Sequence, residues 1–181
     1  MTSLPLRDRL VQAGVELLEE EGLGELSLRA ITRRTGVSHG APRRYFPTHN
    51  ALLAAIAATG LADLAERMKP GSTGEPAELL VEAAQSYLRF AAERPGMFEL
   101  LFRHDLLAGA GGNLRATSLP LFQVFTDLVG QVHPGDAKQR ATALWTNIHG
   151  LATLRATNAL ELLGTTDLTP MVRHVVQVHL S

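Results

Sequence analysis

The most chemically distinctive stretch of the sequence is a basic window from Leu28 to Asn50. It contains five arginines and no acidic residue, whereas the whole chain carries 17 basic and 18 acidic side chains. The five are Arg29, Arg33, Arg34, Arg43 and Arg44. A segregated positive patch in a nearly neutral protein points to a polyanionic partner, although a solvated helix face would have the same charge.

Residues that could support catalysis or hold a metal are not arranged for it. The chain has no cysteine, and His174 and His179 are five residues apart, not the four that place two ligands on one helix face. No glycine-rich phosphate loop, paired catalytic carboxylates or nucleophile motif is present. We therefore expect no enzyme activity, no catalytic residue, no metal site and no cofactor.

The overall composition favours helices. There are 31 leucines and 24 alanines against 11 valines and 3 isoleucines, and unbranched side chains lose little rotamer freedom in a helix. The longest apolar run, residues 51–58, is far shorter than a bilayer span, and no secretory signal is visible at the N-terminus. These features predict a soluble, cytoplasmic, all-α protein.

The basic window lies in a pattern of short helices. Apolar spacing predicts a helix over 6–21, a second from Leu28 to Arg34 capped by Ser27, and a third from Ser38 to Tyr45 capped by Ser38. Gly36 lies between the second and third helices and can adopt positive φ. Two short helices joined by a glycine turn, the second of them basic, form a helix-turn-helix, whose second helix enters the major groove of DNA.

Further helices are predicted along the rest of the chain. A fourth runs from a cap at Thr48 to Met68, and Pro70 to Pro76 forms a linker. The remaining predicted helices cover roughly 79–91, 97–107, 114–132, 137–163 with a cap at Asp136, and a last one opened by Thr169 and Pro170. The sequence thus predicts about nine helices, with a DNA-binding domain at 1–50 and a second domain at 51–181.

The stretch from Leu26 to Ile31, the turn Gly36 to Ser38, the pair Tyr45 and Phe46, and Leu52 together resemble the TetR family of repressors. The resemblance implies an N-terminal three-helix helix-turn-helix domain followed by a helical ligand-binding and dimerisation domain. A weaker match at residues 145–150, Trp-Thr-Asn-Ile-His-Gly, resembles a TetR subgroup with a tryptophan followed by histidine-glycine.

Three positions depart from the family pattern and bear on which operator is recognised. Arg43 stands where the family often has tyrosine, and His49 stands where it usually has lysine. Pro42 removes one amide donor early in the recognition helix.

The predicted DNA-binding residues all lie in or beside the basic window. Arg43 and Arg44 point about 100° apart on a helix, so either could read guanine while the other holds phosphate. Tyr45 either contacts phosphate or is partly buried, and Arg33 and Arg34 are divided evenly between DNA contact and solvation. The predicted set is Ser27, Arg29, Ser38, His39, Gly40, Arg43, Arg44, Tyr45 and His49.

A second predicted site is a pocket for a small molecule in the C-terminal part. Its candidate walls are Phe90, Phe98, Phe102, Phe122, Phe125, Trp145 and His149. Trp145 and His149 share a helix face, and His149 would offer one hydrogen bond in an otherwise apolar lining. Ordinary core packing would use the same residues and is the somewhat better supported alternative.

The predicted function is a transcriptional repressor that binds a palindromic double-stranded DNA operator as a homodimer. The resemblance implies that a small ligand, here largely apolar, shifts the fourth helix and releases the DNA, and that the last two helices form the dimer. Met171, Val172, Val175, Val176 and Val178 support that seam, because they exceed one buried stripe. The alternative is an all-helical small-molecule-binding or enzymatic domain with an incidental basic N-terminus.

Overall fold

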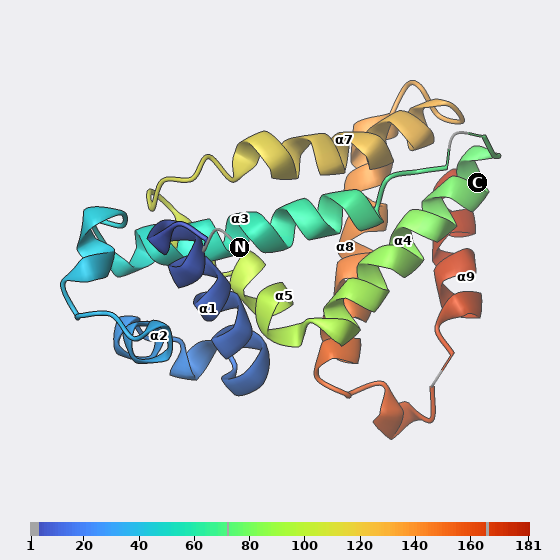
Figure 1. Ribbon diagram of the computed structural model, residues 1–181. Helices are drawn as coiled ribbons and strands as arrows, with labels where there is room; N and C mark the ends of the chain where they lie inside the picture. The colour runs from blue at the N-terminus through green and yellow to red at the C-terminus, as the bar shows by residue number, and fades with distance from the viewer. Residues whose placement is uncertain (1–3, 72, 166) are drawn as a thin grey trace. The chain divides into compact units, whose positions relative to one another are not determined.

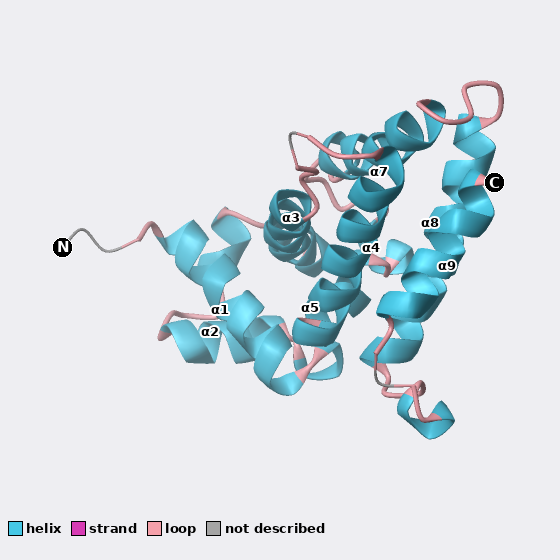
Figure 2. Ribbon diagram, turned by 90° about the vertical axis from the view of Figure 1, so that its right-hand side faces the viewer, coloured by secondary structure: helices cyan, strands magenta, loops and turns pink. Residues whose placement is uncertain are grey.

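The computed structural model describes residues 4–71, 73–165 and 167–181, and these residues form nine α-helices and three short 3-10 helices without a strand. Figure 2 shows helices joined by loops throughout. The α-helices are α1 (Leu6–Glu21), α2 (Leu28–Thr35), α3 (His49–Arg67), α4 (Pro76–Glu93), α5 (Pro95–Leu101), α6 (His104–Leu107), α7 (Arg115–Gly130), α8 (Ala137–Ala156) and α9 (Thr169–Leu180). The 3-10 helices are η1 (Leu23–Glu25), η2 (Ala41–Arg44) and η3 (Glu161–Leu163). The predicted all-α fold is confirmed.

The chain divides into two compact units. Unit 1 comprises Met1–Ala62 and Arg94–Leu114, and unit 2 comprises Asp63–Glu93 and Arg115–Ser181. Helices α5 and α6 therefore pack with the N-terminal helices, although they follow α4 in the sequence (Figure 1). The predicted functional boundary after residue 50 does not coincide with an edge of either unit, and it stays a prediction.

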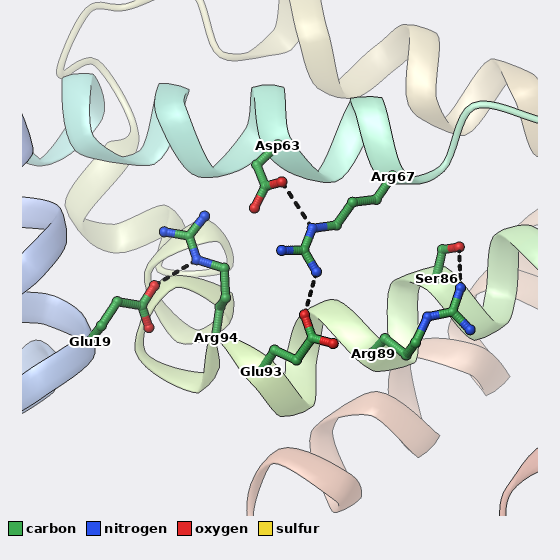
Figure 3. A network of polar contacts seen from close by, with 7 residues as sticks. All are labelled: Glu19, Asp63, Arg67, Ser86, Arg89, Glu93 and Arg94. Carbon is green, nitrogen blue, oxygen red and sulfur yellow. Dashed lines mark hydrogen bonds and ion pairs between the residues drawn. The ribbon is translucent and has the colours of Figure 1, made fainter.

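The core of unit 1 depends on two close helix approaches. A Cβ on Gly14 of α1 would lie 2.3 Å from Ile56 Cδ1, and one on Gly96 of α5 would lie 2.5 Å from the Leu18 carbonyl oxygen. The approach at Gly96 requires glycine because the atom it meets belongs to the backbone, whereas a side chain at Gly14 would require Ile56 to shift. Near the end of α1, Arg94 Nε donates to Glu19 Oε1 at 2.8 Å (Figure 3). The segment after α4 is thus fixed against α1.

Unit 2 is built from α4, α7, α8 and α9. Helix α8 packs against the other three, and α4 also packs against α7 and α9. In the same unit Arg67 donates to Asp63 Oδ1 at 2.9 Å and to Glu93 Oε2 at 2.5 Å (Figure 3). Its guanidinium also lies 5.6 Å from the centre of the Phe90 ring, which is completely buried.

Several predicted helix boundaries were wrong. The long helix expected over 137–163 ends at Ala156, where Asn158 adopts a positive φ of 56°. The helix expected over 97–107 is two helices, α5 and α6, with Phe102 and Arg103 between them. The apolar pattern continues across both breaks, so it did not reveal where these helices end.

Asp136 lies at the N-cap position of α8 as predicted, but the side-chain bonding at the starts of α8 and α9 differs from the prediction. Asp136 makes no cap hydrogen bond and instead accepts from Arg140 Nε at 2.8 Å. Before α9 the capping side chain is that of Asp167, whose Oδ1 accepts from the Thr169 backbone N–H at 2.9 Å, and Thr169 itself is the first residue of the helix.

Candidate nucleic-acid interface

The first helix of the predicted helix-turn-helix forms as its sequence indicates. Ser27 Oγ accepts from the Ala30 backbone N–H at 3.1 Å, so the predicted cap begins α2. Gly36 follows α2 with φ of 68°, and the Val37 N–H closes the turn by donating to the Thr32 carbonyl at 3.1 Å. The cap and the glycine turn are both confirmed.

The second helix is shorter than predicted. The expected helix from Ser38 to Tyr45 is a 3-10 helix, η2, over Ala41–Arg44, and Ser38 does not cap it through its side chain. Pro42 has no amide hydrogen to donate to the Ser38 carbonyl, which instead accepts the shorter-range bond from the Ala41 N–H at 3.0 Å. The Pro42 carbonyl accepts from the Tyr45 and Phe46 N–H groups at 2.9 and 2.8 Å, and Pro42 itself is buried. This proline fixes the element to the core of unit 1.

All nine predicted DNA-binding residues lie in unit 1, and all nine are exposed. They occupy the start of α2, the turn with η2, and the start of α3. Tyr45 is 44% exposed while its neighbour Phe46 is buried, with Arg7 5.5 Å from the centre of the Phe46 ring. Thr48 Oγ1 accepts from the Ala51 N–H at 3.0 Å, which places His49 at the first turn of α3 as predicted.

The arginines of the basic window fall into two groups. Arg34 forms a bidentate pair with Glu20 at 2.6 and 2.7 Å and lies 3.3 Å from Glu16, so it joins α2 to α1. These bonds hold the pKa of the Glu20 carboxyl below its ordinary value. Within the described part of the chain, Arg29, Arg33, Arg43 and Arg44 form no ion pair, and all are exposed. Their charges therefore remain available to an external anion.

The predicted ligand-pocket residues are divided between the two units. Phe98 and Phe102 pack on each other in unit 1 with ring centres 5.1 Å apart. The other five, Phe90, Phe122, Phe125, Trp145 and His149, belong to unit 2. Phe90 and Phe125 are core residues at 0% and 1% exposure, whereas the side chains of Phe122, Trp145 and His149 are half-buried.

The half-buried aromatic side chains of unit 2 lie beside a polar contact between Tyr87 and His149. Trp145 stacks on His149 at 5.3 Å and meets Phe122 edge-on at 6.4 Å. His149 Nδ1 is 2.8 Å from the hydroxyl of Tyr87, which is only 3% exposed. Burial raises the pKa of Tyr87 and lowers the pKa of His149, so both stay neutral near pH 7.

Sequence reasoning did not identify Tyr87 as a residue of the predicted ligand site. Its only signal was an apolar position on the helix over 79–91, and 62 residues separate it from His149.

Two other features bear on ligands of the chain. Among the described residues, no cluster of histidine and carboxylate side chains could hold a metal ion. No helix in the described ranges is long and apolar enough to cross a membrane.

Comparison with known proteins agrees with this arrangement. Residues 10–56 match the family described as bacterial regulatory proteins, tetR family, and residues 80–179 match the tetracyclin repressor-like C-terminal domain. The nucleoid occlusion factor SlmA of Glaesserella parasuis is 32% identical over 92 residues, which cover 50% of this chain and 46% of that protein. The chain spans about half the length of the first curated relatives that it matches.

Solved structures share the fold over nearly the whole chain. A protein of unknown function from Rhodococcus sp. RHA1 is 25% identical with a TM-score of 0.81, covering 98% of this chain and 95% of that one. The structure of BioQ with its double-stranded DNA operator is 14% identical with a TM-score of 0.73, covering 98% and 99%. The fold and the exposed site define a helix-turn-helix regulator. The chain belongs to the TetR family of bacterial transcriptional regulators, which are not enzymes.

Proposed function

We propose that the protein is a repressor that binds a palindromic DNA operator as a homodimer and releases it when a small, largely apolar ligand binds. The observation that carries DNA binding is the set of exposed arginines, Arg29, Arg33, Arg43 and Arg44, which have no ion-pair partner within the described residues. Guanidinium groups match both phosphate and the guanine edge. The operator-bound BioQ structure, which has the same fold, is consistent with this use of the N-terminal region.

In this proposal residues 1–50 bind DNA, and residues 51–181 bind the ligand and form the dimer. Arg43 and Arg44 divide base reading and phosphate binding. Ser38, His39 and Gly40 approach the groove, and Tyr45 and His49 contact the backbone. Ser27 and Arg29 at the start of α2 face the adjacent phosphates, where the amide groups of a helix N-terminus favour anions.

DNA binding is tested by fluorescence anisotropy with the duplex that flanks the protein's own gene. The double variant Arg43→Ala/Arg44→Ala is compared with Arg89→Ala/Arg115→Ala, which removes the same charge from exposed positions of α4 and α7. We expect a loss of at least tenfold in affinity for the first variant only, with unchanged thermal stability for both. Equal losses for the two variants would show that net charge alone causes the binding.

The dimer is proposed to form through α8 and α9. The two helices present exposed apolar side chains, among them Leu154, Met171 and Val178 at 44%, 36% and 53% exposure. Val176 does not test this seam, because it is 1% exposed and belongs to the core of unit 2. Val178→Arg is the sharper variant, with Gln177→Arg at the neighbouring exposed position as its control.

In sedimentation velocity we expect wild type and Gln177→Arg to be dimers and Val178→Arg to be a folded monomer with weakened operator binding. The two half-sites of a palindromic operator lie about 34–36 Å apart. One chain has a single helix-turn-helix, so it can contact only one of them. A Val178→Arg protein that remains dimeric would place the seam elsewhere.

The ligand is proposed to bind in unit 2 against the half-buried ring surfaces of Phe122, Trp145 and His149, with the predicted walls Phe90 and Phe125 giving the apolar surroundings. Phe98 and Phe102 belong to unit 1 and are not part of this proposed site. The stretch of residues 145–150 would place the chain in the TetR subgroup with Trp followed by His-Gly. Trp145 is the only tryptophan, so its fluorescence reports directly on this site.

The ligand site is tested with two sets of probes, neutral aromatic compounds and multiply charged metabolites. We expect that only neutral aromatics change Trp145 emission and release the operator, and that Phe122→Ala weakens both responses. Release of the operator by charged compounds alone would contradict an apolar site.

A further inference from the structure

Thr32 is the one polar residue fully buried among the described residues, at 1% exposure. It lies in α2, and its hydroxyl makes two contacts. Oγ1 is 3.0 Å from the Arg29 carbonyl oxygen and 3.3 Å from Nδ1 of His39. His39 is exposed in the turn between α2 and η2, among the proposed DNA-binding residues. A buried hydroxyl is thus linked directly to an exposed imidazole.

The two contacts determine where the hydrogens lie. A threonine hydroxyl has one hydrogen to donate, and a carbonyl oxygen can only accept. The hydroxyl hydrogen therefore points to the Arg29 carbonyl, and a lone pair of Oγ1 faces His39. For that contact to be a hydrogen bond, Nδ1 of the imidazole must carry the hydrogen. The neutral ring then has a lone pair on Nε2, at the nitrogen not used by Thr32.

We propose that Thr32 fixes the tautomer of His39, so that Nε2 acts as a hydrogen-bond acceptor in the DNA groove. In the major groove adenine N6 and cytosine N4 are donors, whereas guanine and thymine present acceptors. His39 consequently selects adenine or cytosine at the position it meets. Thr32 is a positioning residue that acts through His39. This inference rests on the proposed DNA-binding function.

The tautomer is tested first without DNA, by long-range nitrogen-15 NMR of the full-length protein at pH 8, with His39→Gln used to assign the signals. Wild type is expected to give a protonated-type shift for Nδ1 and an unprotonated-type shift for Nε2. Thr32→Val keeps the shape but lacks the hydroxyl, and the ring should lose this bias. Thr32→Ser restores a hydroxyl and should restore the pattern. A wild-type ring with its hydrogen on Nε2 would overturn the proposal.

The base preference is tested by selection from a randomised duplex DNA pool at the same pH. We expect wild type and Thr32→Ser to prefer adenine or cytosine at one position of each half-site by about tenfold, within what one base contact contributes. In Thr32→Val the preference should fall to about twofold while overall affinity changes little. An unchanged preference in both Thr32→Val and His39→Ala would refute the assignment.

The NMR result separates two kinds of failure. A wild-type protein that enriches no sequence would refute the proposed DNA binding, and the base preference with it, even if the Nδ1–H tautomer is observed. A protein that enriches a clear operator but carries the hydrogen on Nε2 would refute only the role of Thr32.

Discussion

Polar side chains are used in opposite ways in two regions of the molecule. One region is the segment from Ser27 to Tyr45, and the other is the cluster of Tyr87, Trp145 and His149. In the segment, buried backbone and hydroxyl groups are paired locally, while Arg43 and Arg44 stay exposed without an ion pair among the described residues. In the cluster, the polar atoms face one another inside apolar surroundings, with 2.8 Å between the Tyr87 hydroxyl and His149 Nδ1.

This difference predicts that side chains of the first region contribute mainly to binding and side chains of the second mainly to stability. An exposed cation contributes little to folding, so its substitution should change binding and leave stability unaltered. A buried hydroxyl hydrogen-bonded to a half-buried ring contributes to stability, because its removal loses that hydrogen bond in a site shielded from water. The four predictions below test this division, beginning with the largest effect.

Tyr87→Ala should destabilise the protein by about 3–5 kcal/mol, as for other large aromatic truncations in a core. The residue is 3% exposed, so the change leaves a cavity and removes the hydroxyl that lies 2.8 Å from His149 Nδ1. Urea denaturation followed by circular dichroism measures the loss. The control Tyr87→Phe keeps the ring and should lose only about 1 kcal/mol. Equal losses for the two variants would mean that the hydroxyl, not the packing, dominates.

The single variants Arg43→Ala and Arg44→Ala should each weaken operator binding, by about 1–3 kcal/mol for the one that reads a base. That variant should also lose preference at one operator position. The other should weaken all duplexes alike and flatten the salt dependence. Binding titrations at several salt concentrations distinguish them, and thermal melts should be unchanged. A melting temperature lowered by either variant would break the proposed division.

Ser27→Ala should reduce stability by about 1 kcal/mol, because it removes the acceptor for the Ala30 N–H at the start of α2. Ser27→Asp restores a capping acceptor but adds negative charge at the proposed DNA surface. We expect Ser27→Asp to keep the wild-type denaturation midpoint and to bind the operator less well than Ser27→Ala. If Ser27→Asp instead binds DNA as well as wild type, the start of α2 lies away from the phosphates.

The smallest effect expected is a pH dependence from His149. Burial lowers its pKa below the ordinary value of 6.5, so between the two values the unfolded chain binds more protons than the folded one. Stability from this group should therefore be complete above pH 6.5 and fall as the pH drops through the folded pKa. Melts from pH 8 to pH 5 should show a steeper loss for wild type than for His149→Gln. Parallel curves would show that His149 is not held neutral by the fold.

Much of the structure of the segment from Ser27 to His49 could be predicted from local sequence rules. The Ser27 and Thr48 caps, the positive φ of Gly36 and the exposure of all nine predicted residues follow from neighbours within four positions or from polarity. The length of η2 did not follow so simply. Pro42 was recognised as the loss of one hydrogen bond, but the element that contains it is a four-residue 3-10 helix in which Pro42 is buried.

The sequence by itself determined the helical class, the family resemblance and the exposed basic window, because side-chain volume, capping and charge act locally. Only the tertiary structure decided which polar side chains form hydrogen bonds or ion pairs with distant residues. It paired Arg34 with Glu20, joined Thr32 to His39 and Tyr87 to His149, and buried Val176 while exposing Val178. The residues that meet a given helix face depend on which other helices pack against it and at what angle. Partners 14 or 62 residues apart cannot be inferred from the spacing along one helix.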